Sequence, residues 1–366
     1  MKLILTAALA HLAIPSIATI VTIPNVLTNG TVTAESISVP GNLDAPRLSP
    51  PAANLTSYDW WYFDAVSTTD NAAVSIIFFN SGANGFSSRT GAPVYATITG
   101  LFPNGTSFDT GVDATPGAII DYGDDYIFAN WTGSGMSFRG TNLTGVPEYQ
   151  VTIDSPDIGV YGTMTLRSRA PPHYPCGPNK ASEQEQLVPH VFWANMIPDA
   201  TTTVNLRING APITFTDGVG YHDKNWGDAP FAESVSSWYW GHANLGPYSI
   251  VWFDAIDSAG EEHHSGYVSR DGVFSGGCSD VSAVVRPWGG NSTYPPLVST
   301  GVMQGLGVVF DLGVRGVFVA NVTTGRSMFD TDTYVRTIGT VVGGMVGWNE
   351  SFGGVALFEE FKYETS

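Results

Sequence analysis

Short segments rich in β-branched and aromatic residues recur roughly every 8–15 residues, and turns rich in glycine and proline separate them. Evenly spaced segments of this kind predict the strands of a sandwich or barrel. The 42 glycines and 23 prolines suit frequent turns. No helical segments alternate with the strands, which excludes a doubly wound α/β fold. We therefore predict an all-β protein. Its strands are expected at residues 60–65, 74–79, 93–101, 117–121, 125–132, 149–154, 159–168, 203–208, 212–217, 236–243, 248–257, 262–269, 281–286, 307–311, 315–320, 334–339 and 355–362.

An aromatic strand followed by a turn and an apolar strand occurs twice. Residues 60–65 read Trp-Trp-Tyr-Phe-Asp-Ala, and residues 238–243, 178 positions further on, read Trp-Tyr-Trp-Gly-His-Ala. A repeat at this distance indicates two similar β domains rather than a solenoid, although two aromatic hairpins can also resemble each other by chance. We predict a first β domain over residues 19–190 and a second over 191–366.

The first 18 residues have the pattern of a secretory signal peptide. A positive start at Lys2 precedes an apolar run from Leu3 to Ile14, and small residues allow cleavage after Ala18. The alternative is a buried N-terminal strand. No later apolar stretch is long enough to span a membrane.

Sites for N-glycosylation point to the same route. Such sites belong on the surface of a secreted protein, so we predict a secretory or extracellular glycoprotein. The Asn-x-Ser/Thr pattern occurs at Asn29, Asn54, Asn104, Asn130, Asn142, Asn291, Asn321 and Asn349.

The chain has only two cysteines, Cys176 and Cys278. In an oxidising compartment a single disulfide between them is the simplest interpretation, and two free buried thiols are the alternative. Two cysteines by themselves cannot form a structural zinc site.

The charge balance narrows the range of partners. The chain carries 33 acidic and 15 basic residues, and its net charge is −18. Nucleic acids and anionic membrane surfaces require basic patches, so neither is expected as a partner. The sequence does not predict an oligomeric state.

Motifs for metals, phosphates and nucleotides are missing from the sequence. It contains no HExxH, GxSxG, P-loop or GxGxxG pattern, and we predict neither a metal nor an organic cofactor. His263 and His264 are adjacent, so they cannot share one face of a strand. We expect them in a solvated hairpin turn.

The densest polar cluster runs from Tyr221 to Asp228. Strand alternation would place His222, Lys224 and Trp226 on one face and Tyr221, Asp223 and Asn225 on the other. Polar groups are costly in a core unless they are paired. The cluster is therefore either a polar floor beneath a ligand cavity or a structural hydrogen-bond network.

The two aromatic strands supply a second candidate surface. Trp60, Tyr62 and Asp64 share one face of the first strand, and Trp238, Trp240 and His242 share one face of the second. A face that looks into a small barrel can bind an apolar ligand, although ordinary core packing explains many such aromatics. Buried Tyr and Trp need polar partners, so Tyr62, Tyr221, Trp226 and Trp240 are the best candidates to orient a substrate.

The segments Asp59–Ala65 and Gly220–Asp228 together resemble the double-lipocalin superfamily of carotenoid hydratases (hydroxyneurosporene synthases) and AttH-like proteins. Within it the fungal Diels–Alderases are most similar. The resemblance implies two lipocalin-like β-barrel or sandwich domains, no cofactor, and a cavity between or within them for small apolar polyketide or terpenoid substrates. Lys224 stands where many carotenoid-hydratase relatives carry histidine.

Together with the predicted secretion, this resemblance favours the hetero-Diels–Alderase branch. That branch adds a tropolone o-quinone methide to a humulene-type sesquiterpene. Positioning the reactants supplies most of such catalysis, and a single hydrogen-bond donor lowers the barrier further. We predict Asp223, His222 and Lys224 as catalytic groups, with Tyr62 as an alternative donor. The predicted substrate-binding residues are Trp60, Tyr221, Trp226, Trp238, Trp240 and His242.

Three other functions stay open from the sequence. A decalin-forming Diels–Alderase would act on a polyketide. A non-catalytic carrier would only bind an apolar ligand, and an isoprenoid hydratase would add water without forming a ring.

Overall fold

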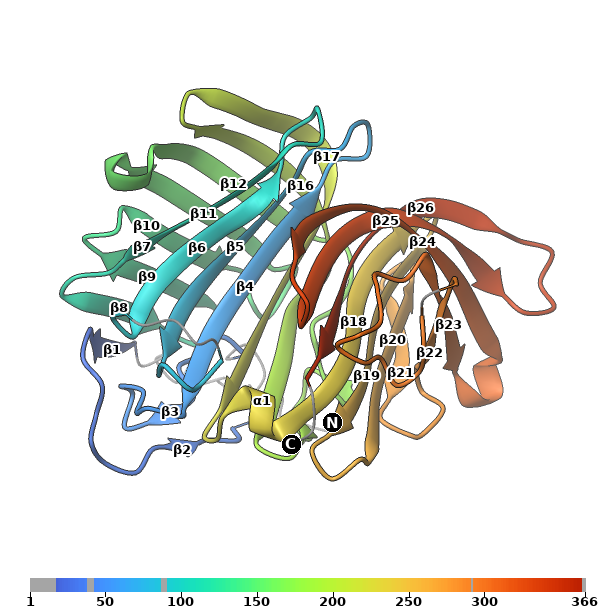
Figure 1. Cartoon of the computed structure of the whole chain (residues 1–366), viewed down its shortest axis with the longest axis horizontal. Coiled ribbons are helices and arrows are strands. Elements are labelled where there is room, and N and C mark those ends of the chain that lie inside the picture. Colours follow the sequence, from blue (N-terminus) through green and yellow to red (C-terminus); the bar gives the residue numbers. More distant parts are fainter. Residues whose placement is uncertain (1–17, 38–42, 87–90, 291, 364–366) are drawn as a thin grey trace, which may run out of the picture.

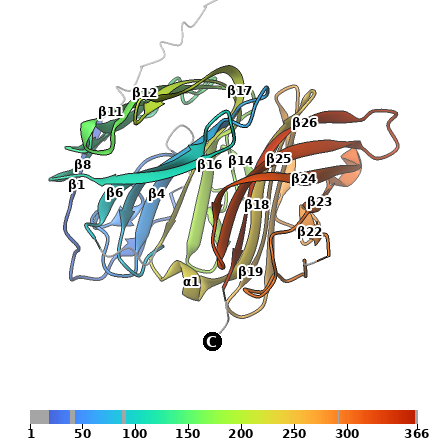
Figure 2. The same cartoon turned by 45° about the horizontal axis from the view of Figure 1, so that its top comes forward.

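The computed structural model describes residues 18–37, 43–86, 91–290 and 292–363. Two curled antiparallel sheets lie side by side in it, as Figure 1 shows and the turned view in Figure 2 repeats. The predicted all-β class is confirmed. Of the predicted signal peptide, only Ala18 is among the described residues.

The first sheet has 15 strands and follows the order β1-β8-β9-β10-β11-β12-β16-β17-β4-β5-β6-β7, with β13, β14 and β15 beside this path. Its strands are β1 Thr19–Pro24, β4 Tyr58–Val66, β5 Ala73–Ser81, β6 Val94–Leu101, β7 Ser107–Asp113, β8 Gly117–Tyr122, β9 Tyr126–Thr132, β10 Met136–Thr141, β11 Glu148–Ser155, β12 Val160–Ser168, β13 His173–Tyr174, β14 Gly177–Pro178, β15 Gln186–Val188, β16 Val191–Ile208 and β17 Ala211–Gly227.

The second sheet has nine strands in the order β21-β20-β19-β18-β26-β25-β24-β23-β22. They are β18 Val235–Leu245, β19 Tyr248–Asp257, β20 Glu262–Arg270, β21 Val273–Gly277, β22 Val284–Trp288, β23 Gly305–Asp311, β24 Val317–Asp330, β25 Tyr334–Met345 and β26 Phe352–Lys362. A small third sheet pairs β2 Thr33–Ala34 with β3 Leu48–Ser49. The short helical turns are η1 Pro156–Ile158, α1 Phe231–Ser234 and η2 Gly313–Arg315. None of the helices in the described ranges has the length and apolar character needed to cross a bilayer.

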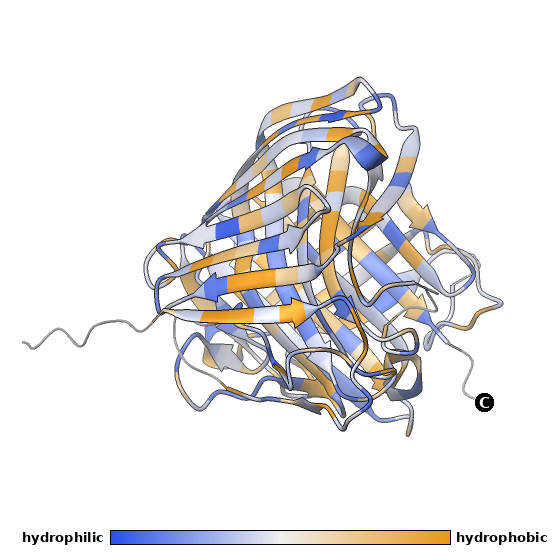
Figure 3. Cartoon of the chain, turned by 90° about the vertical axis from the view of Figure 1, so that its left-hand side faces the viewer, coloured by the Kyte–Doolittle hydropathy of each residue, from blue (hydrophilic) through white to orange (hydrophobic). Residues whose placement is uncertain are grey.

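Side-chain alternation explains how the strands are buried. β11 alternates strictly between exposed and buried residues, so one face covers the core and the other meets solvent. The same alternation of hydrophobic and hydrophilic residues is visible along the strands in Figure 3. By contrast, all nine residues of β4 are buried. Trp61 and Phe63 pack into the core of the first sheet, whereas Trp60 and Tyr62 pack into a core shared with the second sheet.

The chain passes from the first sheet to the second between Gly227 and Val235. The boundary that we expected after residue 190 instead falls at the start of β16, in the first sheet. The chain returns to that sheet after the proline-rich segment 170–180, because β16 pairs with β12 and β17 pairs with β4. The division into two domains, over residues 19–190 and 191–366, stays a prediction.

The predicted disulfide between Cys176 and Cys278 is present, with a separation of 102 residues. Cys176 lies between β13 and β14, which belong to the first sheet, and Cys278 follows β21 of the second sheet. The bond therefore links the two sheets covalently.

The predicted glycosylation sites differ in exposure. Asn54 and Asn130 are partly buried, and Asn291 lies outside the described residues. The exposed sites are Asn29, Asn104, Asn142, Asn321 and Asn349. Attachment of glycans to any of these sites stays a prediction.

Candidate active site

A cavity lies where the two sheets pack against each other, and we call it the inner cavity. It has a volume of about 30 Å³, which holds a water molecule but not an organic substrate. Strands of both sheets and the loop after β5 contribute to its walls. Its lining residues are Trp60, Tyr62, Ile77, Phe86, Asp223, Asn225, Trp238, Trp240, Phe253, Tyr334, Arg336, Glu359 and Phe361.

An outer groove of about 490 Å³ adjoins the inner cavity. This volume lies within the range of about 300–1,000 Å³ that is usual for small-molecule sites. The two spaces share the side chains Ile77, Phe86, Tyr334, Arg336 and Phe361. The groove is also lined by Phe79, Tyr95, Thr97, Thr99, Asp109, Ala232, Phe329, Thr331, Thr333 and Tyr363.

The structure brings most of the predicted site residues to this place. Trp60, Tyr62, Asp223, Trp238 and Trp240 line the inner cavity. They come from three strands, and alternation turns each of them toward the facing sheet.

Two further predicted residues lie directly behind this wall. The Tyr221 ring packs 5.1 Å from the Trp240 ring, and His242 stacks on Tyr221 at 4.6 Å between ring centroids. Both side chains are fully buried. Tyr221 and His242 therefore support the lining rather than form it.

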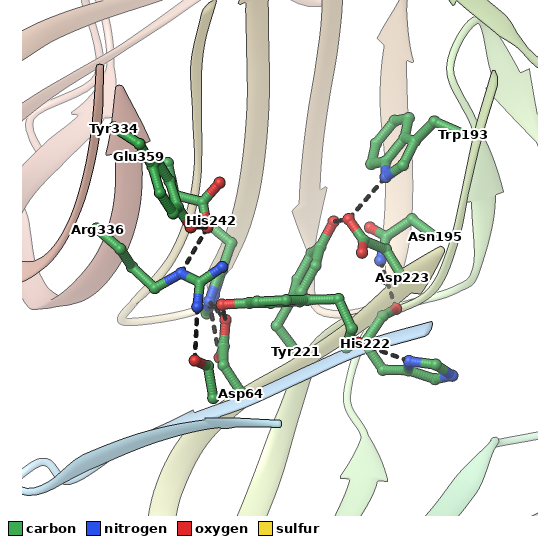
Figure 4. Close-up of polar contacts among 12 residues, drawn as sticks. Asp64, Trp193, Asn195, Tyr221, His222, Asp223, His242, Tyr334, Arg336 and Glu359 are labelled. Atoms are coloured by element: carbon green, nitrogen blue, oxygen red, sulfur yellow. Dashed lines mark hydrogen bonds and ion pairs between the residues drawn. The ribbon is translucent and has the colours of Figure 1, made fainter. Parts of the chain in front are cut away.

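Asp223 is the acidic group on the wall of the inner cavity that the first sheet forms (Figure 4). Its Oδ2 accepts hydrogen bonds from Trp193 Nε1 and from the Tyr221 hydroxyl, both at 2.7 Å. Its Oδ1 has no hydrogen-bond donor among the described residues, and Asp223 lines the cavity. Burial raises the pKa of Asp223 to about 8, and the charges of Glu359 and Asp64 add to this rise. At neutral pH the carboxyl group is therefore mostly protonated and can donate a proton.

Tyr62, Asp64 and His242 form a second polar group. The Tyr62 hydroxyl donates to Asp64 Oδ2 at 2.8 Å, and His242 Nε2 lies 2.9 Å from the same oxygen. Burial raises the pKa of Tyr62 well above its usual value, so its side chain stays a neutral phenol. Since the Tyr62 proton is shared with Asp64, Tyr62 is less available than Asp223 as a donor to a substrate.

A third polar group comes from the second sheet and was not predicted from the sequence. Glu359 Oε1 accepts hydrogen bonds from Arg336 Nε at 2.6 Å and from the Tyr334 hydroxyl at 2.8 Å. Burial raises the pKa of Glu359 above its ordinary value, although the charge of Arg336 and the two hydrogen bonds act in the opposite direction. The available signal was a charged residue inside each of the expected strands 334–339 and 355–362, in a chain with only 13% charged residues.

The other face of β17 points away from the cavity. His222 Nε2 lies 2.9 Å from Asp44 Oδ2, and Lys224 Nζ lies 2.6 Å from Asp59 Oδ1 and donates to the Ala45 carbonyl at 2.9 Å. Burial lowers the pKa of Lys224 to about 8.

Trp226 lies on this same face, and its Nε1 donates to the Glu35 carbonyl at 2.8 Å. Of the predicted site residues, His222, Lys224 and Trp226 do not line the cavity. They bind the N-terminal segment to the first sheet instead. The polar cluster thus serves on one face as a cavity wall and on the other as a structural network.

The histidine pair at 263–264 differs from our expectation of a solvated turn. The turn ends before β20, so both histidines lie in a strand, and His264 is buried. His264 comes close to Asp254 and Glu262, a set that could hold a metal ion. However, Arg286 already contacts both carboxylates, at 2.8 Å and 3.0 Å. Its guanidinium supplies the positive charge in this cluster.

Comparison with known proteins identifies the family and agrees with the fold. Residues 19–283 match the model of a family described as Diels-Alderase-like. The quinolone epoxide rearrangement protein asqO of Emericella nidulans is 42% identical over 365 residues, which cover 99% of this chain and 97% of that protein. The quinolone epoxide rearrangement protein penF of Penicillium thymicola is 39% identical, with 95% of this chain and 96% of that protein covered.

A solved structure shares the fold. The crystal structure of CghA with Sch210972 superimposes with a TM-score of 0.76 at 19% identity and covers 95% of this chain and 99% of that one. The resemblance to fungal Diels–Alderases that two motifs indicated is confirmed by the family match. On the evidence of these matches, the chain belongs to the Diels-Alderase-like family.

Proposed function

We propose that this protein is a cofactor-independent enzyme that isomerises an epoxide on a quinolone-type substrate, with Asp223 as the acid. The observation that carries the proposal is the buried Asp223 carboxyl group, which lines a cavity with three tryptophans and whose pKa burial raises to about 8. Two relatives named for quinolone epoxide rearrangement support it, because each is similar over nearly its whole length.

The chemistry requires one proton donor and a surface that tolerates positive charge. Asp223 Oδ1–H gives its proton to the epoxide oxygen while a C–O bond breaks, which leaves a carbocation. A substituent on the carbon that bears the new hydroxyl then migrates, with its bonding electron pair, to the cationic carbon, and the positive charge passes to the hydroxyl-bearing carbon. The new hydroxyl then returns its proton to Asp223 and becomes a carbonyl. No atom is gained or lost, so the product is an isomer of the substrate.

The aromatic walls suit the cationic intermediate. Trp60, Trp238 and Trp240 line the same cavity as Asp223. A cation near the face of an indole is stabilised by about 2 kcal/mol or more when both are desolvated. Once Asp223 has given up its proton, the negative charge of its carboxylate also stabilises the cation.

The volumes indicate how a substrate would be placed. The outer groove can hold the bulk of a small molecule, whereas the inner cavity cannot. The side chains shared by the two spaces, among them Phe86 and Phe361, must move for a reactive group to reach Asp223. A phenylalanine ring moves when its side chain changes rotamer, and this movement leaves the backbone of the strand in place.

A hetero-Diels–Alder reaction of a tropolone o-quinone methide with a humulene-type alkene is the second candidate. The family description supports a Diels–Alder reaction in general and names no reactants. The Asp223 carboxyl group could donate a hydrogen bond to the heterodiene carbonyl and lower the barrier. We rank it second because the relatives that are similar over the whole chain are named for epoxide rearrangement.

One assay separates these functions. Purified, chelator-treated enzyme is incubated with a synthetic quinolone that carries an epoxide, and the products are analysed by mass spectrometry and NMR. Rearrangement gives a carbonyl compound of unchanged mass, whereas a cycloaddition assay gives an adduct with the summed mass of both reactants. Product ratios equal to those without enzyme in both assays would indicate a carrier. A product heavier by one water would indicate a hydratase.

We also propose that the mature chain begins near Thr19 and is glycosylated in the secretory pathway. The apolar leader, the exposed sites such as Asn104 and Asn321, and the disulfide support this route. Mass spectrometry of the protein from its natural host tests it. An intact Met1 without sugar mass would contradict the proposal.

A further inference from the structure

One guanidinium nitrogen of Arg336 has no hydrogen-bond acceptor within the described part of the chain. Its Nε donates to Glu359 at 2.6 Å, and its Nη1 donates to Ser75 Oγ at 2.6 Å and lies 3.4 Å from Thr99 Oγ1. Its Nη2 makes no hydrogen bond to any of the described residues. Two N–H donors of a permanently charged side chain are therefore free.

The position of Arg336 makes these donors useful. Arg336 lines both the inner cavity and the outer groove, and only 5% of its surface is exposed. Its guanidinium lies 4.8 Å from the centre of the Tyr62 ring, across from the first sheet. Figure 4 shows Arg336 between Glu359 and Asp64 at the contact of the two sheets. Arg336 is the charged side chain among the five that line both spaces, and Asp223 lines the inner one.

The surrounding charges define which chemical group fits. Glu359 already neutralises Arg336, and Asp64 and Asp109 are further acidic groups nearby. An added anion would be repelled by these carboxylates, whereas a neutral oxygen acceptor would not be. A carbonyl oxygen is such an acceptor, and charged donors make the stronger hydrogen bonds to it.

We propose that Arg336 Nη2 binds the carbonyl oxygen of the substrate's lactam ring and so orients the substrate relative to Asp223. This inference rests on the proposed function and takes the substrate to be a 2-quinolone, whose ring carbonyl belongs to a lactam. Arg336 is then a positioning residue, and Asp223 remains the group that exchanges protons with the substrate.

The variants must separate binding from folding. Removing Arg336 alone would leave Glu359 buried without its partner, which destabilises proteins strongly. The double variant Arg336→Met with Glu359→Gln removes both charges and keeps an acceptor for Tyr334. Arg336→Lys is a second variant, because lysine can retain the ion pair but has no second arm. Tyr239→Phe is the matched control, since it removes a buried tyrosine hydroxyl that donates to a neighbouring glutamate, Glu360, and lines neither the cavity nor the groove.

Binding of two probes tests the inference without turnover. The probes are 3,4-dihydroquinolinone and tetrahydroquinoline, which differ by a carbonyl in place of a methylene group. Titration calorimetry of the wild type should show a preference for the lactam of roughly tenfold or more. In the double variant and in Arg336→Lys the preference should fall to about twofold or less, whereas Tyr239→Phe should keep it.

The outcome that overturns the inference is a lactam preference that persists in either folded variant. A wild type that binds both probes equally, or neither, also overturns it. The proposed function fails separately, since its test is formation of a rearranged product by the wild type. If the lactam preference depends on Arg336 but no rearranged product forms, the proposed binding role of Arg336 stands and the proposed reaction is wrong.

Discussion

Asp64 and His242 occupy matching positions of the internal repeat, 178 residues apart, and meet in a buried contact. His242 Nε2 lies 2.9 Å from Asp64 Oδ2 and 3.0 Å from Asp64 Oδ1. Tyr62 and Trp240 also occupy matching positions, and their rings pack edge to face at 5.4 Å. The two similar strands thus face each other, and the inner cavity lies along their contact.

Asp223→Asn should abolish rearrangement while leaving the fold intact. Asparagine keeps an oxygen that can accept from Trp193 and Tyr221 but has no acidic proton. We expect the rate to fall by about 10²–10⁴-fold, the usual contribution of a general acid. Single-turnover kinetics on the synthetic epoxide measure the loss, and the thermal midpoint serves as the control. A folded variant with full activity would exclude Asp223 as the acid.

Tyr221→Phe should move the pH dependence of the reaction upward. The Tyr221 hydroxyl donates to Asp223 Oδ2 and so stabilises its ionised form. In the wild type, activity should fall as the pH rises through about 8, because Asp223 then loses its proton. Removal of the hydrogen bond should raise the pH at which activity is half lost by about one unit or less. Loss of activity at a lower pH than in the wild type would contradict the role of Asp223 as the acid.

The stability of the protein should depend on pH through Asp223. Its pKa is about 8 in the folded protein and near the ordinary 3.8 when unfolded, so the folded state holds the proton more tightly. Its contribution to stability is complete below pH about 4 and is lost as the pH rises through about 8.

Urea titrations at pH 5 and pH 8 check this contribution. The free energy of unfolding of the wild type, relative to Asp223→Asn, should decrease by at most about 1.4 kcal/mol per pH unit over that interval. Parallel pH profiles for the two proteins would show that the Asp223 proton is not linked to folding.

Lys224→Met should weaken folding rather than chemistry. The substitution leaves Asp59 buried without the cation that lies 2.6 Å away, and losses of about 3–5 kcal/mol are usual for such pairs. The double variant Lys224→Met with Asp59→Asn should recover much of this loss, because no unpaired charge remains. Chemical denaturation of the three proteins measures both effects. A stable but inactive Lys224→Met protein would return Lys224 to the catalytic candidates.

Loss of the disulfide should lower stability without changing the site directly. Cys176 and Cys278 close a loop of 102 residues, and chain entropy sets an upper limit of about 4.7 kcal/mol for such a loop. The variant with both cysteines replaced by serine should unfold at lower urea concentration but keep its affinity for the probes at low temperature. Equal urea midpoints for the two proteins would show that the bond does not stabilise the folded state.

Much of the cavity wall that the first sheet forms was predictable, because side chains alternate between the two faces of any strand. A period of two residues places Trp60 with Tyr62, and Tyr221 with Asp223, whatever the rest of the chain does. The same rule separates His222 and Lys224 from Asp223, although it does not say which face meets the cavity. The bonds from His222 to Asp44 and from Lys224 to Asp59 answer that question.

The sequence by itself determined the all-β class, the pairing of the only two cysteines and the face on which each aromatic side chain lies. Only the tertiary structure decided that β16 and β17 belong to the first sheet and that Arg336 and Glu359 complete the cavity. The physical reason is the range of the interactions. Alternation acts between neighbouring residues, whereas the contact of Arg336 with Ser75 joins residues 261 positions apart and depends on how two whole sheets pack.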